Sequence, residues 1–138
     1  MNDVAIPLVA IVGFKRSRFA PLGGMRVLTV RDGVVRLQGK NGTDLESDVA
    51  ALTARLTRTR TVRLESAAGS AYIYGFAQLS KLPDALSQIV IRESAGAELI
   101  GPCPPGTLGA MSPKTVTGAA KVSRALADAL HERGVGDR

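Results

Sequence analysis

Arginine and lysine are the residues of this sequence whose types and spacing best suit a chemical task. Residues 1–63 contain 11 of these basic residues and 5 acidic ones, whereas residues 64–138 contain 7 of each, so the net charge of +6 arises in the first half. The planar guanidinium of arginine binds phosphate or carboxylate through two parallel hydrogen bonds. The pattern predicts a basic face for an anionic partner. Its candidate residues are Lys15, Arg16, Arg18, Arg26, Arg58 and Arg60.

Acid–base or nucleophilic catalysis finds little support among the other side chains. His131 is the only histidine, and its place in the last turn of a predicted helix is typical of a solvated residue at a helix end. Cys103 stands among prolines, without a second cysteine for a disulfide or a metal site and without a basic neighbour to activate it. We therefore expect no catalytic residue, no cofactor and no metal ion, and a protein that is not an enzyme.

Three carboxylates alternate along one predicted strand. Asp44, Glu46 and Asp48 could gather oxygen ligands around a hard cation, but their spacing matches no calcium-binding loop. Alternating polar residues on the solvent side of a sheet explain the same spacing more simply. We adopt that second interpretation.

The basic residues must be positioned by β-strands, because apolar residues of the first half occur in short β-branched runs between turn dipeptides. Asp32-Gly33 suits a two-residue hairpin turn, and Asn41-Gly42 repeats the signal. The predicted strands are Ile6–Val12, Met25–Arg31, Val34–Gln38, Asp44–Ser47, Leu52–Thr57, Thr61–Ser66 and Ala71–Phe76.

Residues 46–58 fit two interpretations. Apolar residues from Leu45 to Leu56 recur at helical spacing, whereas Leu52, Ala54 and Leu56 also alternate with polar residues as in a strand. We favour a turn near residues 48–51 followed by a strand, because a helix would separate the next hairpin from the preceding strands.

Helical spacing replaces the strand pattern after residue 76. Pro83–Ser94 and Pro113–Arg133 are predicted helices, and each begins at a proline, which is favoured in the first helical turn. The prolines and glycines between them cannot propagate a helix or supply strand donors. We divide the chain into a basic β-rich domain with its helix (1–100), a connector (101–112), and a C-terminal helix and tail (113–138). Whether the last helix packs on its own sheet or on another chain stays open.

The order of about seven strands joined by tight turns and followed by a helix resembles the pleckstrin-homology-like (PH-like) superfold in its bacterial form, over residues 5–95. The resemblance implies an α+β fold, with an antiparallel β-meander forming a partly open barrel or sandwich, a capping helix at Pro83–Ser94 and a further C-terminal helix. Members of the superfold bind phosphoinositides or acidic proteins through basic residues around the loop between the first two strands. The matching positions are Lys15 and Arg26, whereas Gly24 stands where the lipid-binding pattern has another basic residue.

Sequence features also bear on location. The apolar run Val4–Gly13 is interrupted by Pro7 and is shorter than the roughly 20 residues that cross a bilayer. It lacks the basic start and the cleavage site of a signal peptide. The single cysteine agrees with a reducing compartment. We expect a cytoplasmic protein without a transmembrane segment, either free or peripheral to the membrane.

These observations together predict a non-catalytic interaction module. Its basic sheet face is expected to bind an acidic protein partner or anionic membrane head groups. Two alternatives remain: a nucleic-acid-binding protein, or a structural subunit of a cellular or viral assembly that forms homo-oligomers through residues 113–133.

Overall fold

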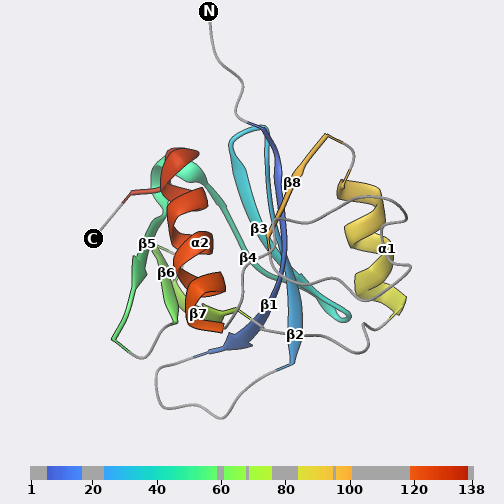
Figure 1. The fold of residues 1–138 in the computed structure, drawn as a ribbon, viewed down its shortest axis with the longest axis horizontal. Helices are drawn as coiled ribbons and strands as arrows, with labels where there is room; N and C mark the ends of the chain where they lie inside the picture. Colours follow the sequence, from blue (N-terminus) through green and yellow to red (C-terminus); the bar gives the residue numbers. More distant parts are fainter. Residues whose placement is uncertain are drawn as a thin grey trace, which may run out of the picture.

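One open sheet of eight strands, with two α-helices packed against it, makes up the part of the chain that the computed structural model describes (Figure 1). The described residues are 6–16, 24–58, 61–67, 69–75, 84–94, 96–100 and 119–136. The elements in chain order are β1 (Leu8–Lys15), β2 (Met25–Arg31), β3 (Val34–Gly39), β4 (Gly42–Asp48), the 3-10 turn η1 (Val49–Ala51), β5 (Thr53–Leu56), β6 (Val62–Ser66), β7 (Gly69–Tyr74), α1 (Asp84–Glu93), β8 (Glu98–Ile100) and α2 (Ala119–Glu132). The predicted α+β class with a partly open antiparallel sheet is confirmed.

The hairpins form where turn chemistry predicted them. Asp32 and Gly33 both have positive φ, 55° and 78°, which is the conformation that a two-residue turn between twisted strands requires. The ambiguous stretch is resolved as η1 followed by β5, so the strand interpretation of residues 52–57 is confirmed. The predicted connector 101–112 and the proline starts of both helices, Pro83 and Pro113, lie outside the described residues.

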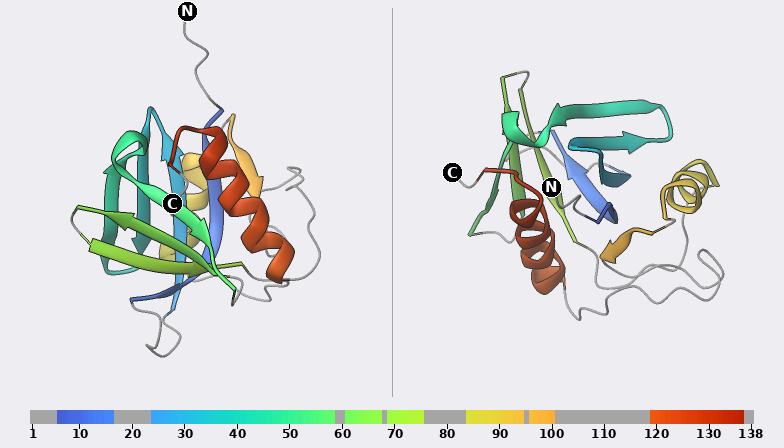
Figure 2. Two further views of the ribbon diagram at one scale, coloured as in Figure 1. Left: turned by 90° about the vertical axis from the view of Figure 1, so that its left-hand side faces the viewer. Right: turned by 90° about the horizontal axis from the view of Figure 1, so that it is seen from above.

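Strand β1 lies in the middle of the sheet order β4-β3-β2-β1-β7-β6-β5. It pairs with β2 from Leu8 to Gly13, but only its last residues, Gly13 to Lys15, pair with β7. The strands β5–β7 consequently cross the strands β2–β4 steeply, so the sheet folds over on itself (Figure 2). The short strand β8, which sequence analysis did not predict, joins β1 in parallel.

Both faces of β1 are buried, which explains its uninterrupted apolar sequence. Leu8, Ala10 and Val12 point into a main core that is enclosed by the folded sheet and α2. Val9 and Ile11 point the other way, into a smaller core beneath α1. The two helices therefore lie on opposite sides of β1 (Figures 1 and 2).

The roles of the two helices differ from the expectation. The predicted capping helix, α1, packs on the outer side of β1 and β2, whereas the buried side of α2, including Val122, Leu126 and Leu130, completes the main core. The open question about α2 is answered, because it packs on its own sheet. Neither described helix is both long and apolar enough to cross a bilayer.

A glycine allows α2 to approach β7 closely. Gly75 follows β7, and its backbone N–H donates a buried hydrogen bond of 3.0 Å to the Ser123 hydroxyl. A Cβ atom at Gly75 would lie 2.3 Å from Cγ1 of Val122. Only a residue without a side chain fits beneath this turn of the helix.

The end of the chain covers the free edge of β5. The N–H of Ala54 donates to the carbonyl of Gly136 at 2.9 Å, and the N–H of Gly136 donates to the carbonyl of Leu52 at 3.0 Å. His131 places Nε2 2.7 Å from the carbonyl oxygen of Ala54. The expectation of a solvated histidine was wrong, because α2 packs in cis and brings this partly buried ring onto the strand edge. The contact protects an edge that would otherwise expose unpaired backbone groups.

Arg133, after α2, bonds to Ile6 before β1 and to Glu98 of β8. Its side chain is 5% exposed, and Nη2 lies 2.8 Å from Oε1 of Glu98 on β8. Nε donates to the carbonyl of Ile6 at 2.9 Å, and Nη1 donates to the carbonyl of Ala129 at 2.9 Å. Every nitrogen of this guanidinium thus has an acceptor, which a charge so deeply buried requires.

We expect Arg133→Met to lower the free energy of unfolding by about 2–4 kcal/mol, because Glu98 and two carbonyls lose their buried partner. Urea unfolding followed by circular dichroism measures the loss. Arg124→Met is the control, since Arg124 is exposed on the same helix and should change stability by less than about 0.5 kcal/mol. Equal stability of the two variants would contradict the fastening role of Arg133.

Gly75→Ala should destabilise the fold by about 1–3 kcal/mol, because the added methyl group overlaps Val122 and pushes α2 away from β7. Gly136→Ala serves as the matched control, because its Cβ would meet Thr53 Cγ2 at an ordinary 3.4 Å. Thermal unfolding distinguishes them, and a normal melting temperature for Gly75→Ala would show that α2 does not need this close approach.

Candidate functional site

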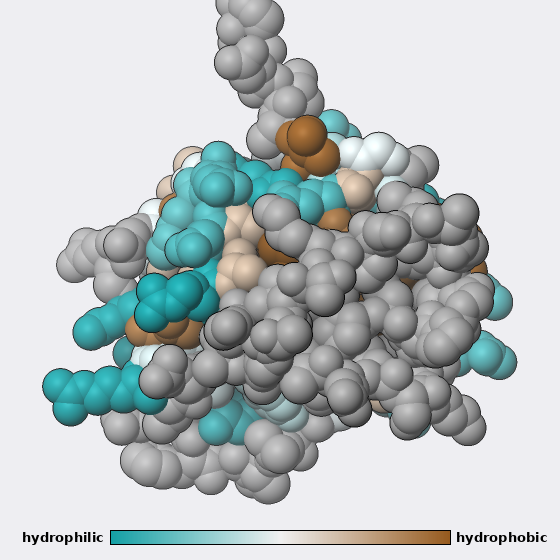
Figure 3. Space-filling model, in the orientation of Figure 1, coloured by the Kyte–Doolittle hydropathy of each residue, from teal (hydrophilic) through white to brown (hydrophobic). Residues whose placement is uncertain are grey.

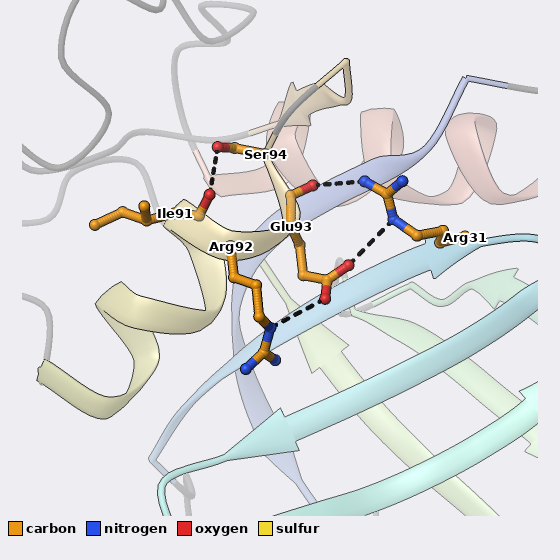
Figure 4. Close-up of polar contacts among 5 residues, drawn as sticks. All are labelled: Arg31, Ile91, Arg92, Glu93 and Ser94. Carbon is orange, nitrogen blue, oxygen red and sulfur yellow. Dashed lines mark hydrogen bonds and ion pairs between the residues drawn. The ribbon is translucent and has the colours of Figure 1, made fainter.

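Two arginines of the β2–β3 hairpin serve the fold. Arg31 donates from Nε to Oε1 of Glu93 at 3.2 Å and from Nη2 to the Glu93 carbonyl at 3.0 Å, which ties the end of α1 to β2 (Figure 4). Arg36 lies directly opposite Glu46 in the β3–β4 ladder, and Nε and Oε1 are 3.1 Å apart. A cation at a helix C-terminus and opposite charges across a ladder both stabilise the fold.

Arg26 and Arg16, two of the predicted site residues, converge on a carboxylate and an aromatic ring. Arg26 Nε lies 2.5 Å from Oδ2 of Asp44, and its guanidinium lies 4.7 Å from the centre of the Phe14 ring. Arg16 is 76% exposed, with Nη2 3.8 Å from Oδ1 of Asp44. Gly39 makes room, because a Cβ there would lie 2.8 Å from Cδ of Arg26. Asp44 therefore holds Arg26 closely, whereas the exposed Arg16 shares the same single carboxylate at a longer distance.

The strand carboxylates consequently act as partners for arginine. Asp44 binds Arg26, and Glu46 binds Arg36. Among the residues that the structure describes, no three His, Cys, Asp or Glu side chains form a group able to hold a metal ion.

A second set of basic residues forms a row across four strands. In the ladder register, Arg55 of β5 is opposite Arg63 of β6, Arg63 is opposite Tyr72 of β7, and Tyr72 is opposite Lys15 of β1. Residues directly opposite in a sheet point to the same face. Their chain neighbours Ala54, Leu64, Ile73 and Phe14 are buried in the main core, so the row lies on the outer face. We call these four residues the basic row.

The basic row lines a hollow of about 360 Å³ at the end of the β5–β6 hairpin. Its lining residues are Lys15, Arg55, Leu56, Thr57, Arg58, Thr61, Arg63 and Tyr72. Four of these eight residues are cationic and none is acidic. The Oγ1 atoms of Thr57 and Thr61 lie 2.8 Å apart, which keeps both hydroxyls at one end of the hollow.

Part of the positive charge around the hollow has no acidic partner among the described residues. Arg55 and Arg58 have no acidic partner among the described residues, whereas Arg63 Nη2 lies 2.9 Å from Oε2 of Glu65. Nε of Arg63 is buried without a hydrogen-bond acceptor in the described part of the chain. Like charges directly opposite in a ladder repel each other, so the Arg55–Arg63 pair costs stability. An anion in the hollow would relieve this repulsion.

A tyrosine beside the basic row helps to hold the site. Tyr74 is opposite Gly13 in the β1–β7 ladder, and its ring covers that glycine so closely that a Cβ would overlap it. Burial raises the pKa of Tyr74 above its ordinary value of 10.0. The neutral ring of Tyr74 thus covers Gly13 of β1, two residues before Lys15.

Few large apolar side chains are exposed on the described part of the molecule. In Figure 3, hydrophilic side chains are prominent at the left of the view, where Figure 1 places α2 in front of β5 and β6. The exposed large hydrophobic residues among those described, Ile6 and Ile91, belong to the segment before β1 and to α1. The basic row thus faces solvent without an apolar surround of that kind.

The six predicted site residues are divided by the structure. Lys15 and Arg58 line the hollow, Arg16 and Arg26 lie around Asp44, and Arg18 and Arg60 fall outside the described residues. Sequence analysis did not select Arg55 and Arg63 for the site. Both alternate with buried residues of their strands, but only the register shows that they share a row with Tyr72 and Lys15.

Replacing Arg55 by threonine should raise the free energy of unfolding by about 0.5 kcal/mol in low salt, because it removes a like-charge pair. Arg36→Thr is the matched control, since it removes an opposite-charge pair from another ladder and should lower stability by a similar amount. Both effects should shrink in about 1 M salt, where the Debye length falls to about 3 Å. A loss of stability in both variants would show that Arg55 supports the fold.

The sequence was also compared with known proteins. No protein-family model matches the chain, and no curated protein matches it. The PH-like resemblance therefore stays a prediction.

Proposed function

We propose that this chain is a non-catalytic interaction module that binds an acidic protein partner through the outer face of β1, β7, β6 and β5. The observation that carries the proposal is the hollow where Lys15, Arg55, Arg58 and Arg63 come together, with no acidic residue among the described residues that line it. Its titratable lining groups are all lysine, arginine or tyrosine. Such a set donates hydrogen bonds and attracts anions, but it offers no carboxylate or imidazole as a general base.

The surroundings of the hollow favour a soluble partner over a membrane. A membrane-docking surface combines basic residues with apolar or aromatic ones that enter the lipid boundary. Ile6 and Ile91, the large exposed hydrophobics among the described residues, belong to other parts of the fold. Anionic head groups are therefore the second candidate ligand for the same face.

Nucleic acid is a weaker candidate. Proteins that bind single strands stack successive bases on several aromatic side chains. Tyr72 is the one aromatic residue among those that line the hollow. This composition suits a compact anionic group more than a row of bases.

Self-assembly through α2 receives no support from its packing. The apolar side chains Val122, Leu126 and Leu130 are buried in the core of their own chain. The PH-like superfold, predicted from strand order, and the cytoplasmic location, predicted from the short apolar run Val4–Gly13 and in agreement with the single cysteine, are part of the same proposal.

Fluorescence anisotropy with a labelled peptide of ten glutamates tests the proposal. We expect binding in about 50 mM salt that weakens strongly at higher ionic strength and falls at least about tenfold in the Arg55→Glu/Arg58→Glu variant. Arg36→Glu is the control, because it reverses one charge on a distant strand and should retain most of the affinity.

The same variants are measured against a ten-nucleotide DNA strand and phosphatidylserine vesicles. The proposal fails if the peptide does not bind or if Arg36→Glu weakens binding as much as the double variant. Tighter binding of the DNA or of the vesicles, with the same dependence on Arg55 and Arg58, would replace the protein partner with that ligand.

A further inference from the structure

We propose that the hollow beside the basic row is a recognition site for a phosphorylated side chain of the protein partner. This inference rests on the proposed function, because it names the group of the partner that enters the site. It is carried by the charge of the hollow, by its donors and by its shape.

The charge of the hollow exceeds what one carboxylate neutralises. Four cationic side chains line it, and two of them, Arg55 and Arg58, have no acidic partner among the described residues. A glutamate or aspartate of the partner brings one negative charge, whereas a phosphoryl group brings about 1.5 to 2 at neutral pH. The dianion therefore matches the excess charge better.

The donors are also more numerous than two carboxylate oxygens can use. The guanidinium groups of Arg55, on β5, and of Arg58, in the turn after it, both line the hollow, and each carries five N–H donors. A phosphoryl group has three strong acceptor oxygens, and guanidinium groups bind them in bidentate fashion. Three oxygens allow one phosphoryl group to accept from both guanidinium groups at once.

One feature indicates that an anion belongs beside Arg55 and Arg63. These residues are directly opposite in the ladder, where two cations repel each other. A phosphoryl group in the hollow that both residues line would screen the repulsion.

The shape of the site selects a side chain over a flat surface. The hollow of about 360 Å³ is within the range of sites that enclose small ligands. Leu56 and the ring of Tyr72 contribute apolar lining, against which the carbon atoms next to a phosphate ester can pack. A phosphorylated residue can enter such a site, whereas a lipid head group is held at a bilayer surface that has to approach the whole face.

The test titrates the protein with N-acetyl-phosphoserine methylamide and follows backbone amide signals of Arg55, Arg63 and Tyr72 by NMR. The comparison ligands are the corresponding glutamate derivative and inorganic phosphate at equal ionic strength. We expect the phosphoserine derivative to bind at least about tenfold more tightly than the glutamate derivative, because its charge is larger. Its affinity should rise between about pH 5 and pH 7, as the phosphate loses its second proton near pH 6.

Arg55→Ala and Arg58→Ala should each weaken phosphoserine binding at least about fivefold, which corresponds to a charge-assisted hydrogen bond. Arg36→Ala, which removes an arginine that is paired with Glu46, should leave the affinity unchanged. Thermal unfolding of each variant establishes that it is folded.

The outcomes separate this inference from the proposed function. Equal affinity for the phosphoserine and glutamate derivatives, together with binding of the polyglutamate peptide, would overturn phosphate recognition and leave the acidic partner. Binding of inorganic phosphate but not of the ester would also overturn it, because the site would then accept only a free ion. Binding of phosphatidic acid vesicles without binding of the soluble ester would assign the site to a lipid.

Discussion

The burial of β1 on both faces is the constraint on which the rest of the structure depends. Because Val9 and Ile11 need cover on one side and Leu8 and Val12 on the other, α1 and α2 must occupy opposite sides of the sheet. On one edge β1 pairs with β2 from Leu8 to Gly13, and on the other edge it pairs with β8 at its start and with β7 only from Gly13 to Lys15. The pairing at the end of β1 aligns Lys15 with β7, β6 and β5, so the strand that centres the core also sets the layout of the basic row.

The formal charge of the first half does not show which of its arginines are paired with carboxylates. Arg26, Arg31 and Arg36 carry the same charge as Arg55 and Arg58, yet each of the first three is held by a carboxylate of another element. Their charges join strands and a helix end, so they contribute to stability more than to recognition. What distinguishes the basic row is position. It lies on an outer sheet face whose acidic residue, Glu65, is already paired with Arg63, so attraction for an anion is concentrated there.

Local chemistry determined what could be predicted from the sequence. The turn at Asp32-Gly33 and the strand after residue 51 follow from backbone preference and alternation, which are properties of neighbouring residues. Strand β8 has three residues and pairs with β1, which lies about 90 residues earlier in the chain, so no local sequence pattern predicts it. Charge alone indicated Lys15 and Arg58, but it also indicated Arg16 and Arg26. Arg26 is set apart by Asp44 of β4. Arg55 shares a row with Lys15 only through the pairing of β5, β6, β7 and β1, and β7 and β1 are far apart in the chain.

Because the turn after α2 closes the fold, part of the core cannot be covered until late in synthesis. Arg133 bonds to a residue 127 positions earlier, and His131 bonds to one 77 positions earlier. The hairpins can form as they leave the ribosome, but the inner face of β1 and the edge of β5 wait for α2. At 5 to 20 residues per second, the interval between the appearance of β5 and of residue 136 is roughly 4 to 16 s. During that time the nascent chain carries an uncovered apolar face beside an unpaired strand edge, and it is then that binding by a chaperone matters most.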